Sequence, residues 1–203
     1  MIKNIIFDMG GVFIEFNPSH FLNCVCNNSQ DKQILMDSIF ACKQWSMLDE
    51  GLLDEQELYD VVTKKIPSYL WQTAHFLIFH WNEIAHKYTE VNEYAKSLKS
   101  RGYRLYLLSN ASKRVFEECW TRIKFNEFID GQVISAIAKM TKPNKEIYEY
   151  LLNEYQLNPK ECVFIDDSEI NVEAAISCKI EGIVHDGDIN TLKNSLETIL
   201  TLK

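Results

Sequence analysis

Three compact, mostly apolar runs in the chain predict buried strands of a parallel sheet. They cover residues 2–7, 103–108 and 162–165, and two weaker runs lie at residues 132–135 and 183–185. A strand covered on both faces shows apolar residues without alternation, and glycine or polar residues then allow the chain to turn. All three stronger runs end in this way, so we expect each to be followed by a turn.

Segments with apolar residues at helical spacing alternate with these strands after about residue 90. The pattern of strand followed by helix predicts βαβ units and therefore an α/β fold with a parallel sheet flanked by helices. In such sheets, ligands bind at the carboxyl ends of the strands. The predicted helices are residues 91–101, 112–124, 144–155, 168–178 and 191–202.

Residues 19–88 show a different pattern, with helical spacing throughout and no convincing strand. Asp54 and Glu57 have the spacing of a capping box that opens a helix, and Pro67 marks a later break. The simplest interpretation is a helical insertion after the first strand. We expect residues 18–88 to form this insertion and residues 1–17 and 89–203 to form the core.

The composition is that of an ordinary globular protein, with 46% apolar and 25% charged residues. A net charge of −8 argues against nucleic acid or an anionic membrane surface as a partner. The longest apolar stretch, near residues 74–81, is too short to span a bilayer. The six cysteines lack the spacing of a zinc site and suggest free thiols in a reducing compartment. We therefore expect a cytoplasmic protein that is a monomer or a weak dimer.

Four polar signals follow apolar runs or precede a helix, and together they suggest a catalytic site. Each alone has a bland interpretation, because an aspartate at a strand end can cap a turn or a helix, and a lysine before proline can lie in an exposed loop. Placed at one sheet edge, they would supply a carboxylate nucleophile, oxygen ligands for Mg²⁺, and hydrogen-bond donors for a phosphoryl group. The signals are Asp8, Ser109-Asn110, Lys142 and Asp166-Asp167.

The order and spacing of these motifs resemble the haloacid dehalogenase superfamily over nearly the whole chain. The similarity is strongest from Lys142-Pro143 to the segment at residues 164–175. The opening Phe7-Asp8-Met9-Gly10-Gly11-Val12 resembles the branch that contains bacterial α-glucose-1-phosphate phosphatases and, more distantly, the phosphatase domain of soluble epoxide hydrolase. This resemblance implies a Rossmann-like core with a helical cap after the first strand.

The resemblance also implies a magnesium-dependent phosphatase mechanism. Asp8 would attack phosphorus to give an aspartyl-phosphate, which water then hydrolyses. Mg²⁺ would be held by Asp8, the backbone carbonyl of Gly10 and Asp167, with Asp166 close by. The substrate would be a small phosphorylated metabolite, and a sugar phosphate is favoured.

Three further residues would contact or balance the phosphoryl group in this scheme. Ser109 and Asn110 would hold it, and Lys142 would balance the charge between the phosphoryl group and the acidic cluster. Asn171 matches a position that supports the loop of the metal site. The substrate-facing part of the cap is expected near Trp45, which has two interpretations: a wall of the substrate pocket or ordinary packing within the cap.

One position departs from the pattern of most phosphatases in this superfamily. They carry a second aspartate two residues after the nucleophile, as general acid and base, and here that position is Gly10. Three explanations remain open. In the first, the leaving group is acidic enough to need less help, as in a sugar 1-phosphate. In the second, Glu15 or Asp49 replaces the missing acid, with Glu15 also interpretable as a hinge residue. The third explanation is a different reaction.

The alternative reaction is metal-independent dehalogenation of 2-haloacids, which uses the same aspartate nucleophile and lacks the second aspartate. Two acids at Asp166-Asp167 favour the phosphatase, because a cation site needs them. A catalytically idle phosphate-binding protein is the remaining alternative, and intact Asp8, Lys142 and Asp167 argue against it.

Overall fold

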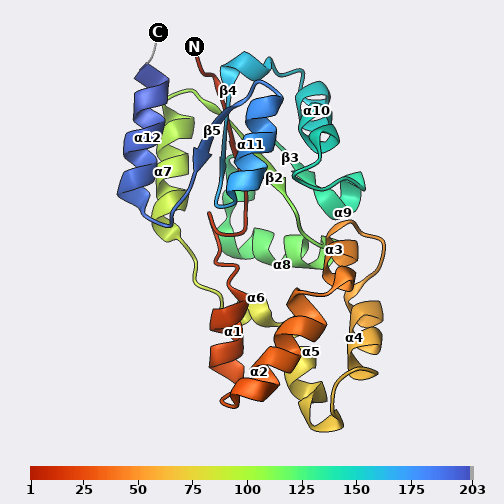
Figure 1. Cartoon of the computed structure of the whole chain (residues 1–203). Helices are drawn as coiled ribbons and strands as arrows, with labels where there is room; N and C mark the ends of the chain where they lie inside the picture. Colours follow the sequence, from red (N-terminus) through yellow and green to blue (C-terminus); the bar gives the residue numbers. More distant parts are fainter. Residues whose placement is uncertain (202–203) are drawn as a thin grey trace.

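The computed structural model describes residues 1–201, without the side chains of residues 120–123 and 126, and contains one parallel sheet. Its five strands follow the order β3-β2-β1-β4-β5, and every neighbouring pair is parallel (Figure 1). The predicted α/β fold with a parallel sheet is therefore confirmed. The strands are β1 (Asn4–Phe7), β2 (Arg104–Ser109), β3 (Gly131–Ile134), β4 (Cys162–Asp166) and β5 (Glu181–Val184).

Helices cover both faces of the sheet. Alternate residues of a strand point to opposite faces, and every residue of β1 and β4 is buried, so both faces need a covering layer. Ile5 and Phe7 of β1 belong to the hydrophobic cluster that includes residues of α7, α8 and α12. Ile6 lies in a second cluster with residues of α10 and α11. The helices of this part are α7 (Thr89–Ser100), α8 (Lys113–Ile123), α9 (Ser135–Ala138), α10 (Lys145–Glu154), α11 (Glu169–Ser177) and α12 (Ile189–Thr201), with short 3-10 turns at Phe125–Glu127 and Pro159–Glu161.

Sequence patterns located these elements to within a few residues. The helix predicted at residues 191–202 corresponds to α12, although residue 202 lies outside the described part of the chain. A short helix, α9, follows β3 directly and was not predicted. In the described part of the chain, no helix has both the length and the apolar character needed to cross a bilayer.

The segment between β1 and α7 is helical and forms the insertion, here defined as helices α1 to α6 (residues 18–84). It lies beyond the carboxyl ends of the strands (Figure 1). The predicted capping box is present, with Asp54 accepting from the Glu57 backbone and Glu57 accepting from the Asp54 backbone. The elements are α1 (Pro18–Val25), α2 (Ser29–Leu35), a π-helical turn (Met36–Phe40), α3 (Lys43–Asp49), α4 (Glu55–Thr63), a 3-10 turn (Ser68–Leu70), α5 (Trp71–Phe79) and α6 (Trp81–Ile84).

The chain enters and leaves the insertion side by side. Ile14 and Lys87 form an antiparallel bridge, and the Glu15 N–H donates to the His86 carbonyl oxygen at 2.8 Å. The Glu15 carboxylate accepts from the His86 backbone N–H at 3.1 Å and contacts His20 Nδ1 at 2.9 Å. Glu15 therefore connects both linkers to the first helix of the insertion, as its hinge interpretation predicts.

Aromatic packing fixes the loop after β1 against the core. The Phe13 ring lies 5.3 Å from that of Phe7 and 4.4 Å from that of Phe125, measured between centroids. All three side chains are at most 1% exposed. Phe13 lies between the loop after β1 (residues 8–12) and the linker into the insertion. Its packing therefore determines where that loop lies.

We predict that Phe13→Ala lowers the free energy of unfolding by about 3–5 kcal/mol, because it removes a buried ring and leaves a cavity. Tyr69→Ala is the matched control, since the Tyr69 side chain is 69% exposed, and it should change stability by less than about 0.5 kcal/mol. Urea unfolding followed by circular dichroism measures both. Equal losses in the two variants would contradict this account of the loop.

Candidate active site

Asp8 stands at the carboxyl end of β1, at the start of a tight loop. Its N–H continues the sheet by donating to the Ile165 carbonyl oxygen at 2.8 Å, and its Oδ1 accepts from the Met9 N–H at 2.6 Å. The Met9 carbonyl oxygen then accepts from the N–H groups of Phe13 and Ile14. The strand and this turn hold the Asp8 carboxylate in one orientation, 8% exposed, at the edge of the sheet.

Lys142 links two of the predicted acidic residues. Its Nζ lies 2.9 Å from Asp8 Oδ2 and 2.6 Å from Asp166 Oδ2, and its side chain is fully buried. Burial by itself lowers the pKa of Lys142, but the charges of Asp8 and Asp166 outweigh it, and the pKa is raised above its ordinary value. Lys142 therefore stays protonated and screens the two carboxylates from each other.

Asn110 positions Lys142. The Asn110 side chain donates to the Lys142 carbonyl oxygen and accepts from the Lys142 N–H, both at 2.9 Å. This pair of hydrogen bonds ties the turn after β2 to the loop that carries Lys142. The predicted role of Asn110 was contact with the phosphoryl group, and the structure adds this second role, which spacing alone did not indicate.

Asp8, Asp166 and Asp167 form an acidic cluster at the ends of β1 and β4. One carboxylate oxygen from each lies within 4.8 Å of the others. Asp166 is fully buried and is held by the Ser168 N–H at 2.8 Å and by Asn171 Nδ2 at 3.1 Å. Asn171 thus supports the loop of the cluster, as predicted.

The charge of this cluster is not balanced by the protein alone. The pKa of Asp8 is raised to about 7, chiefly by burial; the charge of Lys142 opposes this shift and the charge of Asp166 adds to it. Burial and the Asp166 charge also raise the pKa of Asp167. Three carboxylates face one lysine, so a divalent cation would remove the remaining repulsion. Hard carboxylate oxygens are the donors that Mg²⁺ prefers, and the residues present fit that ion.

Gly11 leaves the space that Asp167 occupies. Gly11 has a φ of +68°, and a Cβ atom added there would lie 2.1 Å from Asp167 Oδ2. A side chain at this position would therefore displace the carboxylate from the cluster. This close approach of Asp167 explains why residue 11 is a glycine. Gly10 lines the adjoining cavity.

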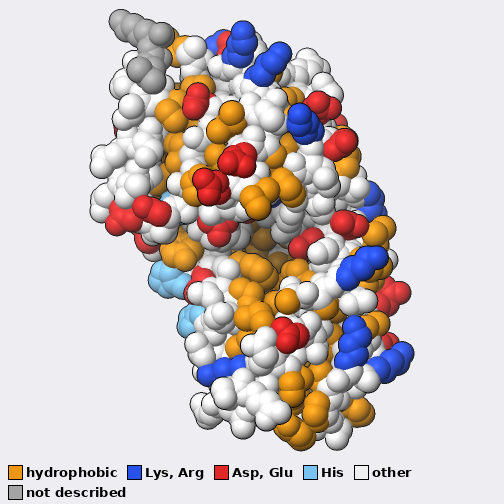
Figure 2. Space-filling view, in the orientation of Figure 1, with side chains coloured by type: hydrophobic (Ala, Val, Ile, Leu, Met, Phe, Trp, Pro, Cys, Tyr) orange, Lys and Arg blue, Asp and Glu red, His pale blue; other side chains and the backbone are white. Residues whose placement is uncertain are grey.

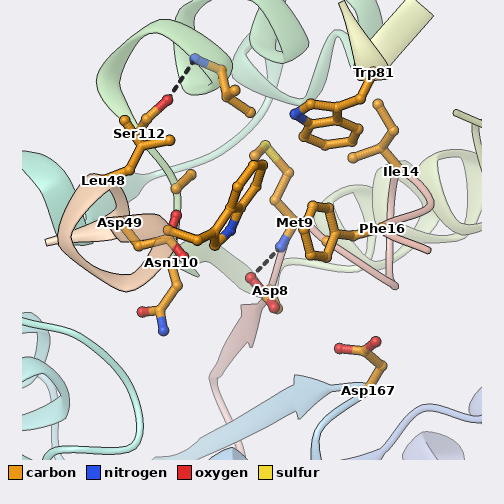
Figure 3. Close-up of a pocket in the computed structure, with 14 residues that line it drawn as sticks. Asp8, Met9, Ile14, Phe16, Leu48, Asp49, Trp81, Asn110, Ser112 and Asp167 are labelled. Atoms are coloured by element: carbon orange, nitrogen blue, oxygen red, sulfur yellow. Dashed lines mark hydrogen bonds between the residues drawn. The ribbon is translucent and has the colours of Figure 1, made fainter. Parts of the chain in front are cut away.

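A cavity of about 170 Å³ opens directly beside Asp8. It lies at the waist of the molecule, between the sheet and the insertion, where Figure 2 shows a hollow with hydrophobic side chains gathered around it. Figure 3 shows that its walls come from the strand ends on one side and from the insertion on the other. The lining residues are Asp8, Met9, Gly10, Ile14, Phe16, Trp45, Leu48, Asp49, Trp81, Asn110, Ala111, Ser112, Val115 and Asp167.

Asp49 is the acidic residue of the insertion that lines this cavity. It ends α3, and its carbonyl oxygen accepts from the Ser135 hydroxyl at 2.6 Å. Ser135 is fully buried at the start of α9, and its oxygen also accepts from the Ala111 N–H at 3.0 Å. Burial, followed by the Asp8 charge, raises the pKa of Asp49 to about 7. Ser135 was missed as a site residue, although its place directly after β3 puts it at the same sheet edge.

A partly buried ion pair also joins the insertion to the core. Arg114 of α8 lies 3.2 Å from Glu55 of α4, and the Ser112 hydroxyl donates to the same carboxylate. Arg114 donates as well to the carbonyl oxygens of Ile78 and Phe79 at 3.0 and 2.9 Å. These contacts hold α4 and α5 against α8, which keeps the cavity covered.

The other predicted residues lie where the strands end. Ser109 is the last residue of β2 and is 1% exposed, beside the cavity-lining residues Asn110 and Ala111. Glu15 lies at the hinge with His20 and is absent from the cavity lining given above. Of the two acids considered as replacements for the missing one, Asp49 is therefore the one at the cavity.

Comparison with known proteins identifies the family. Residues 2–179 match the haloacid dehalogenase-like hydrolases, and the chain belongs to that family. A D-ribitol-5-phosphate phosphatase from Bacteroides thetaiotaomicron is 25% identical, over 85% of this chain and 86% of its own length. A sesquiterpene phosphatase from Aspergillus oryzae is 24% identical, over 99% of this chain and 95% of its own length.

A solved structure shares the fold. A HAD family enzyme from Bacteroides thetaiotaomicron, determined as a variant in complex with magnesium and inorganic phosphate, superposes with a TM-score of 0.74. It is 23% identical, and the superposition covers 95% of this chain and 98% of that one. At this level of identity the likeness establishes the fold.

We predict that Gly11→Ala removes the response of the protein to Mg²⁺, because the new methyl group displaces Asp167. In the wild type, Mg²⁺ binding to the folded state should raise the unfolding temperature. The matched control is Gly102→Ala, since Gly102 also has a positive φ of +93° but has no atom within 4 Å of the added Cβ. Differential scanning fluorimetry across a Mg²⁺ titration should show a rise in unfolding temperature for the wild type and for Gly102→Ala, and none for Gly11→Ala. A normal shift in Gly11→Ala would contradict the role given to that glycine.

Proposed function

We propose that this protein is a magnesium-dependent phosphomonoester hydrolase in which Asp8 is the nucleophile. The observation that carries the proposal is the position of Asp8, fixed at a cavity wall with its Oδ2 at 2.9 Å from Lys142 Nζ and within reach of two further carboxylates. A nucleophilic carboxylate, a buried lysine and an acidic cluster at one strand edge form a set suited to phosphoryl transfer.

In the proposed reaction, Asp8 attacks the phosphorus atom and the bond from phosphorus to the leaving oxygen breaks. Mg²⁺, held by Asp8, the Gly10 carbonyl and Asp167 with Asp166 close by, would neutralise charge on the phosphoryl oxygens. Lys142 keeps Asp8 oriented and offsets the negative charge. Ser109 and Asn110, at the end of β2, would donate hydrogen bonds to the phosphoryl group. Water then attacks phosphorus, which releases phosphate and restores Asp8.

Asp49 supplies the proton that Gly10 cannot. It lines the cavity that Asp8 lines, and the Ser135 hydroxyl holds its backbone over the strand ends. The raised pKa of about 7 keeps a large fraction of its carboxyl protonated near neutral pH. In the first step Asp49 gives its proton to the leaving oxygen, and in the second it takes a proton from the attacking water, so the cycle balances.

The relatives support phosphatase activity and leave the substrate class open. One is named for a polyol phosphate and the other for a sesquiterpene substrate. The preference for a sugar phosphate and the closeness to the α-glucose-1-phosphate phosphatase branch both stay predictions. Asp166 and Asp167 favour phosphate ester hydrolysis over dehalogenation, because a metal-independent reaction would have no use for three clustered carboxylates.

The first test is phosphate release from a panel of phosphomonoesters, with and without Mg²⁺. We predict that Asp8→Asn lowers the rate by at least about three orders of magnitude, because the amide cannot act as the nucleophile. The matched control is Asp37→Asn, an exposed aspartate of the π-helical turn that does not line the cavity, and it should keep the wild-type rate. If no ester releases phosphate, 2-haloacids are tested next, and inactivity on both would leave only phosphate binding.

We predict that Asp49→Asn lowers kcat/KM for an alkyl phosphate, which reports the step in which the leaving group departs, by about 10²–10⁴-fold, the usual contribution of a positioned acid and base. The loss should be much smaller for 4-nitrophenyl phosphate, since its leaving group needs no proton. Glu50→Gln, which changes the adjacent carboxyl, is the control and should leave both rates unchanged. Equal losses for the two esters would assign Asp49 a structural role instead.

The pH dependence of the same variant gives a second readout. The ratio of the wild-type rate to the Asp49→Asn rate should fall as pH rises through the pKa of Asp49, about 7; ionisation of Asp8, whose pKa is also about 7, affects both proteins and cancels in this ratio. Because the folded pKa is raised above 3.8, ionisation of Asp49 destabilises the folded protein progressively from about pH 4 to about pH 7. Asp49→Asn should therefore unfold at a higher temperature than wild type at pH 8, and the difference should shrink at pH 5.

A further inference from the structure

The part of the cavity that faces the insertion is apolar. Its side chains come from the entry linker, from α3 and α6 of the insertion, and from α8 of the core. The Phe16 ring lies 5.7 Å from the Trp45 ring and 5.1 Å from the Trp81 ring, measured between centroids. Figure 3 shows the Phe16 and Trp81 rings on one side of the space next to Asp8. The apolar wall consists of Ile14, Phe16, Trp45, Leu48, Trp81 and Val115.

The polar side chains of the lining are mostly occupied by the protein itself. The Ser112 hydroxyl donates to Glu55 and accepts from the Val115 N–H at 3.2 Å. Asn110 is bound at both ends of its amide to the Lys142 backbone. Asp8 and Asp167 belong to the phosphoryl site. Among the described lining residues, the groups left for a leaving group are the Asp49 carboxyl and the indole N–H groups of the two tryptophans.

This wall discriminates against a polyol. A sugar ring carries several hydroxyl groups, and each one buried against an aromatic or aliphatic side chain loses its hydrogen bonds to water without replacement. An apolar group in the same place has no hydrogen bonds to lose, and its transfer out of water is favourable. The Trp81 indole nitrogen is buried and has no hydrogen-bond partner in the protein. Two indole N–H groups are too few to satisfy a ring of hydroxyls.

We propose that the substrates are phosphomonoesters of small apolar alcohols, those carrying one ring or a short branched hydrocarbon. This inference rests on the proposed phosphatase function and departs from the sugar phosphate that the motifs suggested. The size limit comes from the cavity, whose volume of about 170 Å³ compares with the roughly 150 Å³ of an apolar protein cavity that holds benzene. The phosphoryl group lies at the strand ends and the hydrocarbon lies against Trp45 and its neighbours.

Two esters of matched shape test this proposal. Cyclohexylmethyl phosphate and glucose 6-phosphate both place the phosphate on a primary alcohol attached to a six-membered ring, and they differ chiefly in the ring hydroxyls. With Mg²⁺ present, kcat/KM should favour cyclohexylmethyl phosphate by at least about 10²-fold, since leaving several hydroxyls unpaired costs more than one small group in a hydrophobic pocket. An equal rate, or a preference for glucose 6-phosphate, would overturn the inference.

Acetyl phosphate separates this inference from the function on which it rests. Hydrolysis of acetyl phosphate without either ring ester would overturn the substrate class and leave the phosphatase standing. No hydrolysis of any of the three would overturn both. A preference for cyclohexylmethyl phosphate with normal acetyl phosphate hydrolysis would support both.

Variants locate the selectivity in the wall. Trp45→Gln places an amide among the rings and should lower the ratio of the two kcat/KM values by about tenfold or more. Trp71→Gln is the control, since Trp71 is 44% exposed on α5, and the ratio should not change. Val115→Thr is nearly isosteric and replaces Trp45→Gln in the test if that variant does not fold. It should also lower the ratio. An unchanged ratio in the folded wall variant would overturn the assignment of this wall.

Discussion

The contact of one buried lysine with two carboxylates is the interaction on which the rest of this site depends. Lys142 meets Asp8 and Asp166 at the ends of the adjacent strands β1 and β4. Two carboxylates so close together in a buried place would repel each other and take up a proton without it. The parallel order of the strands is what brings the groups to one edge, and Asn110, in the turn after β2, orients the loop that carries the lysine. Sheet order and charge balance therefore determine the site together.

The insertion completes what the core lacks. Gly10 has no acidic side chain, and we propose Asp49 as the general acid in its place. Asp49 lies on α3 and is anchored to the core through Ser135. The Glu55–Arg114 pair holds the same layer of helices against α8. A proton source carried on the covering layer is in place only when that layer is seated. In the proposed mechanism, placing this layer over the strand ends would both exclude water and bring the acid to the cavity, as in enzymes whose lids complete the site.

The sequence predicted the sheet and the acidic edge because both depend on local rules. Buried parallel strands read as apolar runs, and the polar residue that follows each run must lie at the strand end. What depends on packing between distant segments could not be read in this way. Spacing did not select Asp49 over Glu15, since that choice depends on how α3 is seated. Nor did it indicate that Asn110 binds the Lys142 backbone or that Ser135 joins α3 to the turn after β2. The domain boundaries and the roles of the site residues stay predictions.

The paired linkers have an evolutionary consequence. Ile14 and Lys87 are neighbours, so the chain enters and leaves the whole insertion at what is in effect a single point. A segment attached in this way can grow, shrink or be exchanged without moving β1 or α7. Ancestral recombination or drift can therefore alter which molecules are accepted while the core residues Asp8, Lys142 and Asp167 are inherited unchanged. The paired linkers therefore allow one reaction to be adapted to many different metabolites.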